Sequence, residues 1–140
     1  MYRKFNSIGE AYEILKRELK ERGNLIYNPQ SNKMVKELIG VTFKVPIDFF
    51  MTYYKERPEN FELETAFNEA LKNSFKNKSN SNGLASIQII VRKKPTIVVY
   101  FRNLDIETLL LDFAVIARKT FLVFGEGEII YFIGKLYLNL

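Results

Sequence analysis

The sequence predicts a single α+β domain, in which about three helices pack on a mixed or antiparallel β-sheet. With 140 residues, the chain is long enough for one hydrophobic core. Twelve Phe and eight Tyr supply large apolar side chains for that core. Segments with helical spacing of apolar residues alternate with segments in which every second residue is apolar. The predicted element order is α-β-β-α-β-β-α-β, in one domain over residues 1–140.

The first helix is predicted from its end signals. Ser7 and Glu10 match a capping box, in which a serine oxygen and a glutamate carboxylate satisfy free amides at a helix start. Gly23 supplies the stop. Between them, apolar residues recur at helical spacing: Ile8, Ala11, Tyr12, Leu15 and Leu19.

Two strands are predicted to follow. Residues 25–27 form a short apolar run that Asn28-Pro29 ends. After a polar loop, the alternation of Val41, Phe43 and Val45 predicts a strand with one buried face, closed by Pro46.

The remaining elements are a helix, a hairpin, a helix and a final strand. Apolar spacing predicts a second amphipathic helix from about Asn60 to Phe75. Two β-runs then have hairpin spacing, and a third helix follows with Asp105 as N-cap. Its near-continuous apolar content predicts burial on most sides. The β-runs cover 84–91 and 96–101, the helix 106–121, and the last strand 129–133, with 136–140 extending or following it.

The composition excludes several kinds of catalytic site. The chain has no Cys, and it also lacks His and Trp. It therefore has no thiolate nucleophile or Cys-ligated zinc, and it lacks the commonest general base and metal ligand. No metal site and no cofactor are expected.

The sequence predicts a soluble cytoplasmic protein without a membrane partner. No apolar run approaches the roughly 20 residues that cross a bilayer. The basic N-terminus has no apolar segment behind it, so it does not match a secretory signal. The absence of Cys fits a reducing compartment.

The net charge of +5 is unevenly distributed, because residues 70–104 contain basic residues and no acidic one. This stripe, from Lys72 to Arg102, has two interpretations. It is either a nucleic-acid contact or a solvated face beside a basic hairpin tip. The candidate nucleic-acid residues are Lys76, Lys78, Arg92, Lys93 and Lys94.

Two blocks of sequence carry a family resemblance. The first runs from the helix with Ala11-Tyr12 through Asn28-Pro29 to residues 36–43. The second contains Val99-Tyr-Phe-Arg-Asn-Leu-Asp105 and, after a helix, Gly134-Lys-Leu-Tyr137. In this order they resemble the thymidylate synthase and dCMP hydroxymethylase family over roughly half of the positions, with a shortened middle. The resemblance implies a thymidylate-synthase-like sheet.

The resemblance also implies that the catalytic machinery has been lost. In that family a cysteine attacks C6 of a pyrimidine nucleotide, and its position here falls at or near Gly83. A phosphate-binding arginine of the family becomes Gln30, and its His-x-Tyr ribose pair becomes Tyr137 and Asn139. The segment that closes over the folate in the family is expected to be missing after Tyr137. We expect the fold without the activity, and no catalytic residue is assigned.

Six residues are candidates for a nucleotide site. The resemblance matches Arg102 and Asp105 to phosphate-site positions, and Asn103 replaces the family's serine. Each candidate also has a structural interpretation: Arg102 pairs with Asp105, Asp112 lies on an exposed helix strip, and the others are core or surface residues. The six are Arg102, Asn103, Asp105, Gln88, Asp112 and Tyr137.

Three functions follow as hypotheses. The first is a non-catalytic thymidylate-synthase-like protein that binds a pyrimidine nucleotide or acts as an interaction or regulatory module, and family analogy adds a homodimer formed through the sheet. The second is a nucleic-acid-binding module that uses the basic stripe. The third is a residual pyrimidine nucleotide C5 methyl- or hydroxymethyltransferase.

Overall fold

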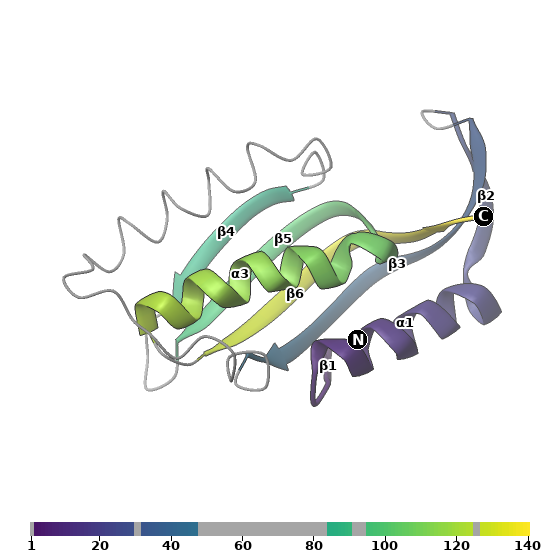
Figure 1. Ribbon diagram of the computed structural model, residues 1–140. Coiled ribbons are helices and arrows are strands. Elements are labelled where there is room, and N and C mark those ends of the chain that lie inside the picture. Colours follow the sequence, from purple (N-terminus) through teal and green to yellow (C-terminus); the bar gives the residue numbers. More distant parts are fainter. Residues whose placement is uncertain (1, 30–31, 48–83, 91–94, 125–126) are drawn as a thin grey trace.

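The computed structural model describes residues 2–29, 32–47, 84–90, 95–124 and 127–140, and these form a mixed sheet with helices on one side (Figure 1). The strands are β1 (Tyr2–Lys4), β2 (Asn24–Asn28), β3 (Lys33–Pro46), β4 (Leu84–Ile90), β5 (Thr96–Asp105) and β6 (Glu128–Asn139). The helices are α1 (Ile8–Arg22), the 3-10 turn η3 (Ile106–Thr108) and α3 (Leu109–Phe124). The predicted α+β class is confirmed, while the helix expected at about 60–75 lies outside the described residues.

The six-stranded sheet has the order β1-β3-β6-β5-β4, and β2 pairs with β3. β1 runs parallel to β3, and β5 runs parallel to β6. The other pairs are antiparallel, so the sheet is mixed, as expected. β6 pairs with nearly the whole length of β3, and β1 and β2 pair with different parts of β3.

Helix α1 has the predicted ends. The amide of Glu10 donates to Ser7 Oγ at 3.1 Å, and the Glu10 carboxylate accepts from the amide of Asn6 at 2.9 Å. Gly23 caps the other end through its amide, which donates to the carbonyl of Leu19. The predicted apolar side faces the core, where Ala11, Leu15 and Leu19 are fully buried.

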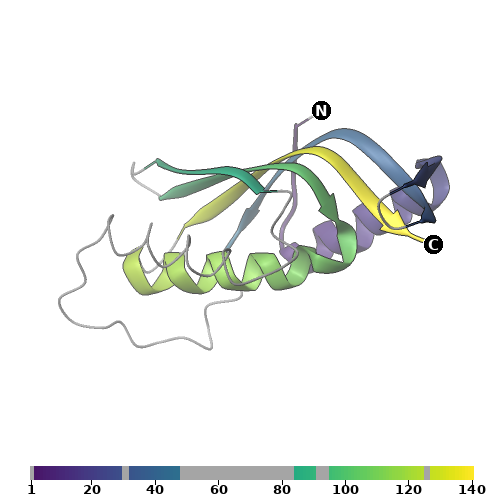
Figure 2. The same cartoon turned by 90° about the horizontal axis from the view of Figure 1, so that it is seen from above.

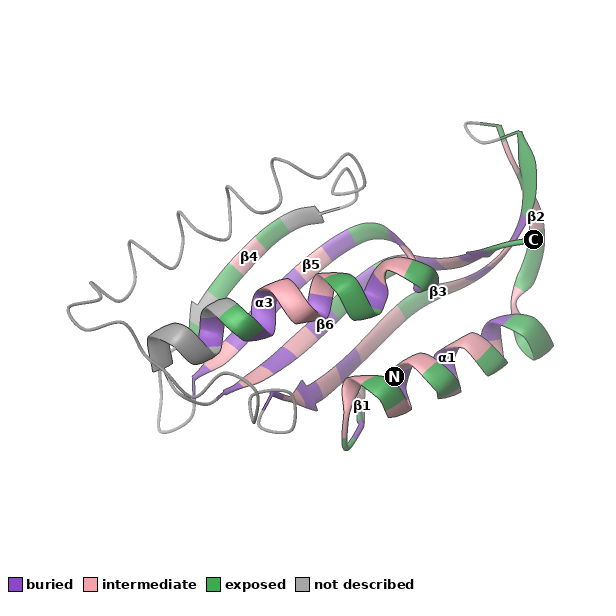
Figure 3. Cartoon of the chain, viewed as in Figure 1, coloured by how far each residue is buried: buried purple, intermediate pink, exposed green. Residues whose placement is uncertain are grey.

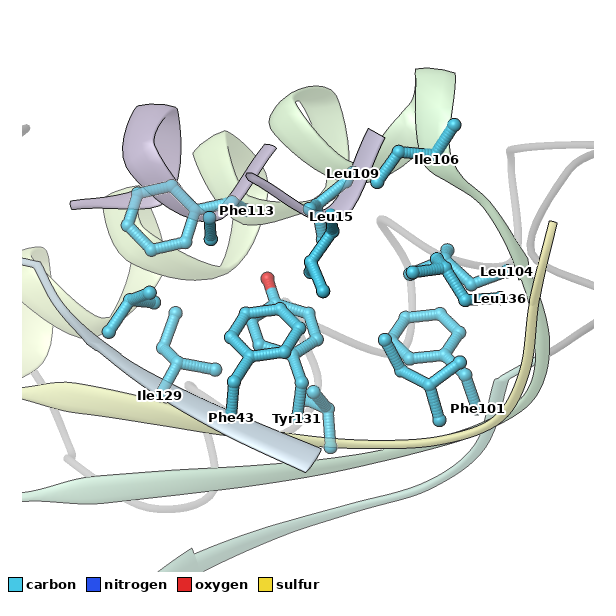
Figure 4. Close-up of a cluster of buried hydrophobic side chains, with 14 of the residues drawn as sticks. Leu15, Phe43, Phe101, Leu104, Ile106, Leu109, Phe113, Ile129, Tyr131 and Leu136 are labelled. Carbon is cyan, nitrogen blue, oxygen red and sulfur yellow. The ribbon is translucent and has the colours of Figure 1, made fainter. Parts of the chain in front are cut away.

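Both helices cover the same face of the curved sheet (Figure 2). The core lies between these helices and the sheet, and buried residues alternate along the strands that face it (Figure 3). Three aromatic rings from adjacent strands stack in a row on this face: Phe43, Tyr131 and Phe101 (Figure 4). We call the opposite side of the sheet, which no described helix covers, the outer face.

Helix α3 differs from its prediction in two ways. Asp105 does act as an N-cap, but it caps the 3-10 turn η3, and the α-helix begins at Leu109. The helix is buried along one side only, because Leu110 and Leu111 are 40% and 59% exposed. The apolar content of this helix therefore predicted more burial than the structure has. None of the described helices has both the length and the apolar character to cross a membrane.

The sheet bends where Gly40, Gly134 and Arg102 lie on adjacent strands. The register is continuous from Ile39↔Lys135 to Val41↔Ile133, so Gly40 lies opposite Gly134. Gly40 has a positive φ of 69°, which favours glycine. Past this row the buried positions shift: in β5 the core residue after Phe101 is Leu104, and in β6 Leu136 follows Ile133 in the same way. The strands thus change which side chains face the core.

Candidate functional site

Among the described residues, a cavity lies beyond this bend, between the β2–β3 hairpin and the ends of β5 and β6. Its volume is about 290 Å³. We call it the hairpin pocket. Its polar lining comes from Asn28, Glu37, Asn103, Lys135 and Tyr137, and its apolar lining includes Ile26, Pro29 and Val35.

Strand register explains why these distant residues meet. Glu37 of β3 lies opposite Tyr137 of β6, and Asn103 of β5 lies beside Lys135 of β6. β2 folds back along β3, which places Asn28 near the same end of the sheet. The pocket is therefore built by neighbouring strands of one sheet and by the hairpin that closes them.

Glu37 is the most unusual residue of the hairpin pocket. It is a carboxylate with only 8% of its surface exposed. Its Oε2 atom is shielded from solvent and accepts no hydrogen bond from the described residues. The Nζ atom of Lys135 lies 3.2 Å from that oxygen and forms an ion pair with it. Buried carboxylates are costly unless they are paired and hydrogen-bonded, so this group is only partly compensated.

Tyr137 adds a neutral hydroxyl to the lining. Its partial burial raises the pKa of the phenol above the ordinary value, and the negative charge of Asp105 raises it further. The phenol therefore keeps its proton near neutral pH, where it can both donate and accept a hydrogen bond.

Asp105 has a structural role beside the pocket. One of its carboxylate oxygens accepts from the amide of Glu107 at 3.0 Å, and the other accepts from Asn139 Nδ2 at 3.1 Å. The first bond caps η3, and the second ties the end of β5 to the end of β6. Arg102, the predicted partner of Asp105, makes no ion pair with it.

Arg102 instead lies on the outer face, in a second and more open hollow of about 280 Å³. Its side chain is exposed, without a hydrogen bond or ion pair to the described residues. Beside it, the rings of Tyr100 and Phe132 stack with their centroids 5.0 Å apart. Arg102 and Asn103 are therefore neighbours in sequence that belong to different hollows.

The other two candidates lie outside the hairpin pocket. Gln88 is an exposed residue of β4, opposite Val98. Asp112 is half-buried on α3, close enough to Tyr131 to raise the pKa of that buried phenol. The expectation that Asp112 belongs to an exposed strip is wrong, since the exposed residues of this helix segment are Leu110, Leu111 and Arg118.

The remaining expected positions lie outside the described residues. They include the basic candidates Lys76, Lys78, Arg92, Lys93 and Lys94, together with Gln30 and Gly83. Within the described ranges, no group of three or more acidic side chains is placed to hold a metal ion.

Three polar residues of the pocket, Asn28, Glu37 and Lys135, were not among the candidates from the sequence. Glu37 carries a signal in retrospect. It follows Val35 at a spacing of two residues, so it is a carboxylate on the same side of β3 as a buried apolar residue. Lys135 has no comparable signal, because an alternating lysine in a strand is ordinarily a surface residue.

Comparison with known proteins assigns no relationship: the chain matches none of the protein-family models and none of the curated proteins.

Proposed function

We propose that this chain is a non-catalytic protein of the thymidylate synthase type that binds a pyrimidine nucleotide in the hairpin pocket. One observation carries the proposal. Two residues that the sequence resemblance places among the nucleotide-site candidates, Asn103 and Tyr137, line one pocket with Asn28-Pro29 of the first resemblance block, although the three are far apart in the chain. Unrelated surface positions would rarely converge in this way.

The size and lining of the pocket support a small ligand with an aromatic ring. Its volume is at the lower end of the range typical of ligand sites, about 300–1,000 Å³. Apolar Ile26 and Val35 and the ring of Tyr137 suit the faces of a base, while Asn28 and Asn103 offer amide groups to its edges.

The non-catalytic part of the proposal rests on composition. Covalent addition to C6 of a pyrimidine requires a strong nucleophile, and the chain contains neither Cys nor His to supply or activate one. The protonated phenol of Tyr137 is no substitute. Binding of the nucleotide without its chemical conversion is the function that this composition supports.

One expectation from the resemblance has to change within this proposal. Arg102 lines the second hollow and not the hairpin pocket, so it is not placed to hold the phosphate of a nucleotide in the hairpin pocket. Among the described lining residues, Lys135 is the cation, and its side chain is 44% exposed. We therefore assign the phosphate contact to Lys135.

Thermal unfolding with dUMP, dCMP and dTMP tests this function. A ligand at ten times its dissociation constant stabilises the folded state by about 1.4 kcal/mol, which is a measurable shift. Asn103→Trp should fill the pocket and abolish the shift, while Glu13→Trp, at an exposed position on α1 outside the pocket, should preserve it. Because the natural chain has no Trp, each variant also gives a single fluorescence signal. No shift with any of the three nucleotides at millimolar concentration would refute the proposal.

We also propose that two copies of the chain associate through the outer face. The stacked Tyr100 and Phe132 lie on this face, and Phe132 is 37% exposed. Ile90, on the same face, is 38% exposed. Exposed apolar groups on a sheet face are typical of protein interfaces.

A further inference from the structure

Strand β2 (Asn24–Asn28) forms an edge of the described sheet. It pairs with β3 alone, so its other edge has no strand partner among the described residues. In Figure 1 the β2–β3 hairpin projects from the sheet beyond the end of α1. Edge strands present unpaired amide and carbonyl groups that can accept a further strand, and proteins usually protect them with charged residues or proline. The sequence of β2, Asn-Leu-Ile-Tyr-Asn, contains neither.

One side of this hairpin is apolar and exposed. Leu25 and Tyr27 of β2 are 57% and 53% exposed. Met34, which lies opposite Tyr27 on β3, is 42% exposed. Residues two apart in a strand share a side, and directly paired residues share it too. The three side chains therefore form one apolar surface beside the open edge, and we call it the edge patch.

Basic residues lie at both ends of β2. Positions 20–36 contain five charged residues, of which four are basic and one, Glu21, is acidic. Lys20 and Arg22 are exposed on the last turn of α1, which leads into β2. Lys33 is exposed opposite Asn28, at the other end of the strand. A chain lying along the open edge would therefore meet cationic groups at each of its ends.

These features distinguish between three kinds of occupant. The hydrocarbon of a membrane would cover the edge patch but offer no partner to the backbone groups of the open edge. A second copy, paired antiparallel about Ile26, would place Asn24 opposite Asn28 of the other copy. The basic ends of the two copies, near Arg22 and Lys33, would then repel each other. An extended peptide with acidic ends would satisfy the backbone groups and also complement the charge.

We propose that the open edge of β2 binds an extended peptide segment of a partner protein, which adds to the sheet as a further strand. Apolar residues at alternate positions of the peptide cover the edge patch, and acidic residues at its ends contact Lys33 and the last turn of α1. This function is separate from nucleotide binding, because Leu25, Lys33 and Met34 do not line the hairpin pocket.

Selection from a displayed random-peptide library on the full natural chain tests this proposal. Enriched peptides should have alternating apolar residues and Asp or Glu at their ends. A synthetic copy of the strongest binder should slow amide hydrogen exchange within residues 24–28, which contact between side chains alone would not do. Tyr27→Lys places a charge on the edge and should weaken binding about tenfold or more. Leu111→Lys, at an exposed position on α3, should leave binding unchanged.

Tyr27 also borders the hairpin pocket, so two variants outside that pocket complete the test. Leu25→Thr keeps a strand-forming residue but removes apolar surface, and it should weaken binding several-fold. Lys33→Glu should also weaken binding several-fold, while Lys4→Glu, at an exposed position on β1, should not. Leu25 and Tyr27 are both more than half exposed, so the folded chain should tolerate their substitution.

Several results would overturn the proposal. They are the absence of enriched peptides, a consensus with basic ends, and unchanged amide exchange within residues 24–28. Self-association that Tyr27→Lys abolishes would identify a second copy as the occupant. Binding to phosphatidylserine vesicles that Tyr27→Lys abolishes would identify a membrane surface. Either of these last two results would also overturn the assignment to a peptide.

Discussion

The carbonyl oxygen of Arg102 lies 2.9 Å from the position that a Cβ atom on Gly134 would occupy. A side chain of any size at position 134 would therefore press against the backbone of β5. This close approach falls at the bend of the sheet. There, Gly134 of β6 has β5 on one side and Gly40 of the neighbouring strand β3 on the other. The lining residues Asn103 and Lys135 come directly after this point, so the shape of the hairpin pocket depends on it.

Gly134→Ala should lower the free energy of unfolding by about 1–3 kcal/mol, the usual cost of forcing extra atoms into a packed position. Urea denaturation measures the change. Gly9→Ala is the matched control, because its Cβ would meet only Ser7 Oγ, at 3.8 Å, and alanine favours the helix. The control should be as stable as the natural protein or slightly more stable. A Gly134→Ala variant with unchanged stability would mean that β5 and β6 can separate at no cost.

Local sequence signals predicted α1, whereas β1 carries no such signal and was not predicted. Ser7, Glu10 and Gly23 act on backbone groups within a few residues of themselves, so the sequence alone determines where this helix begins and ends. Tyr2–Lys4 became a strand only because it pairs with residues 42–44 of β3. A three-residue strand carries no period of its own, and such pairing is invisible in one sequence.

The same distinction applies to the candidate site. Asn103 and Tyr137 were predicted and do line one pocket, whereas Arg102 was predicted beside them and lies on the outer face. Phe101 and Leu104 both face the core, so Arg102 and Asn103 between them both face away from it, and alternation along one strand does not reveal that they line different hollows. Glu37 was missed because its burial comes from the hairpin and from β6, both of which are tertiary contacts.

The hydroxyl of Tyr131 gives a second prediction, because it points from the sheet toward Leu15 of α1 and has no hydrogen-bond partner among the described residues (Figure 4). The residue is fully buried. Tyr131→Phe should therefore raise the free energy of unfolding by about 1 kcal/mol, since an unsatisfied buried hydroxyl is removed. Tyr12→Phe should have the opposite effect on the free energy of unfolding. The Tyr12 hydroxyl donates to Glu107 and accepts from Lys16, so its loss should cost about 0.5–1 kcal/mol. A destabilised Tyr131→Phe protein would show that its hydroxyl does have a partner.

Tyr131 also predicts how stability changes at alkaline pH. Burial raises the pKa of its phenol well above the ordinary value of 10.0, and the negative charge of Asp112 raises it further. Below pH 10 the phenol is protonated in both the folded and unfolded states, so this residue adds no pH dependence. Above pH 10 the unfolded chain releases the proton while the folded chain keeps it, and stability falls. Urea midpoints at rising pH should therefore drop less steeply in Tyr131→Phe than in the natural protein. Parallel curves would contradict this.

The ion pair between Arg3 and Glu18 gives a fourth prediction, because it joins β1 to α1. Arg3 Nη1 and Nη2 donate to the two Glu18 oxygens at 2.7 and 2.9 Å, which is a bidentate geometry. Glu18→Gln should lower the free energy of unfolding by about 1 kcal/mol, and added salt should reduce this difference. Glu13→Gln, on an exposed part of the same helix, should stay within about 0.5 kcal/mol of the natural protein. Equal effects of the two substitutions would assign the loss to helix charge in general and not to this pair.

The stacked rings of Tyr100 and Phe132 predict where two copies of the chain meet. Phe132→Arg should convert the proposed dimer to a monomer, as measured by light scattering after gel filtration. In a two-fold symmetric interface the substitution appears on both copies, so two guanidinium groups would be brought into one desolvated contact. The folded monomer should tolerate it, because Phe132 is already 37% exposed.

Leu111→Arg is the matched control for this substitution. Leu111 is 59% exposed and lies on α3, in the helix layer, so the variant places the same charge away from the outer face. If Leu111→Arg dissociates the protein and Phe132→Arg does not, the copies meet through the helices. If the natural protein is monomeric at high micromolar concentration, the outer face is not a contact between copies.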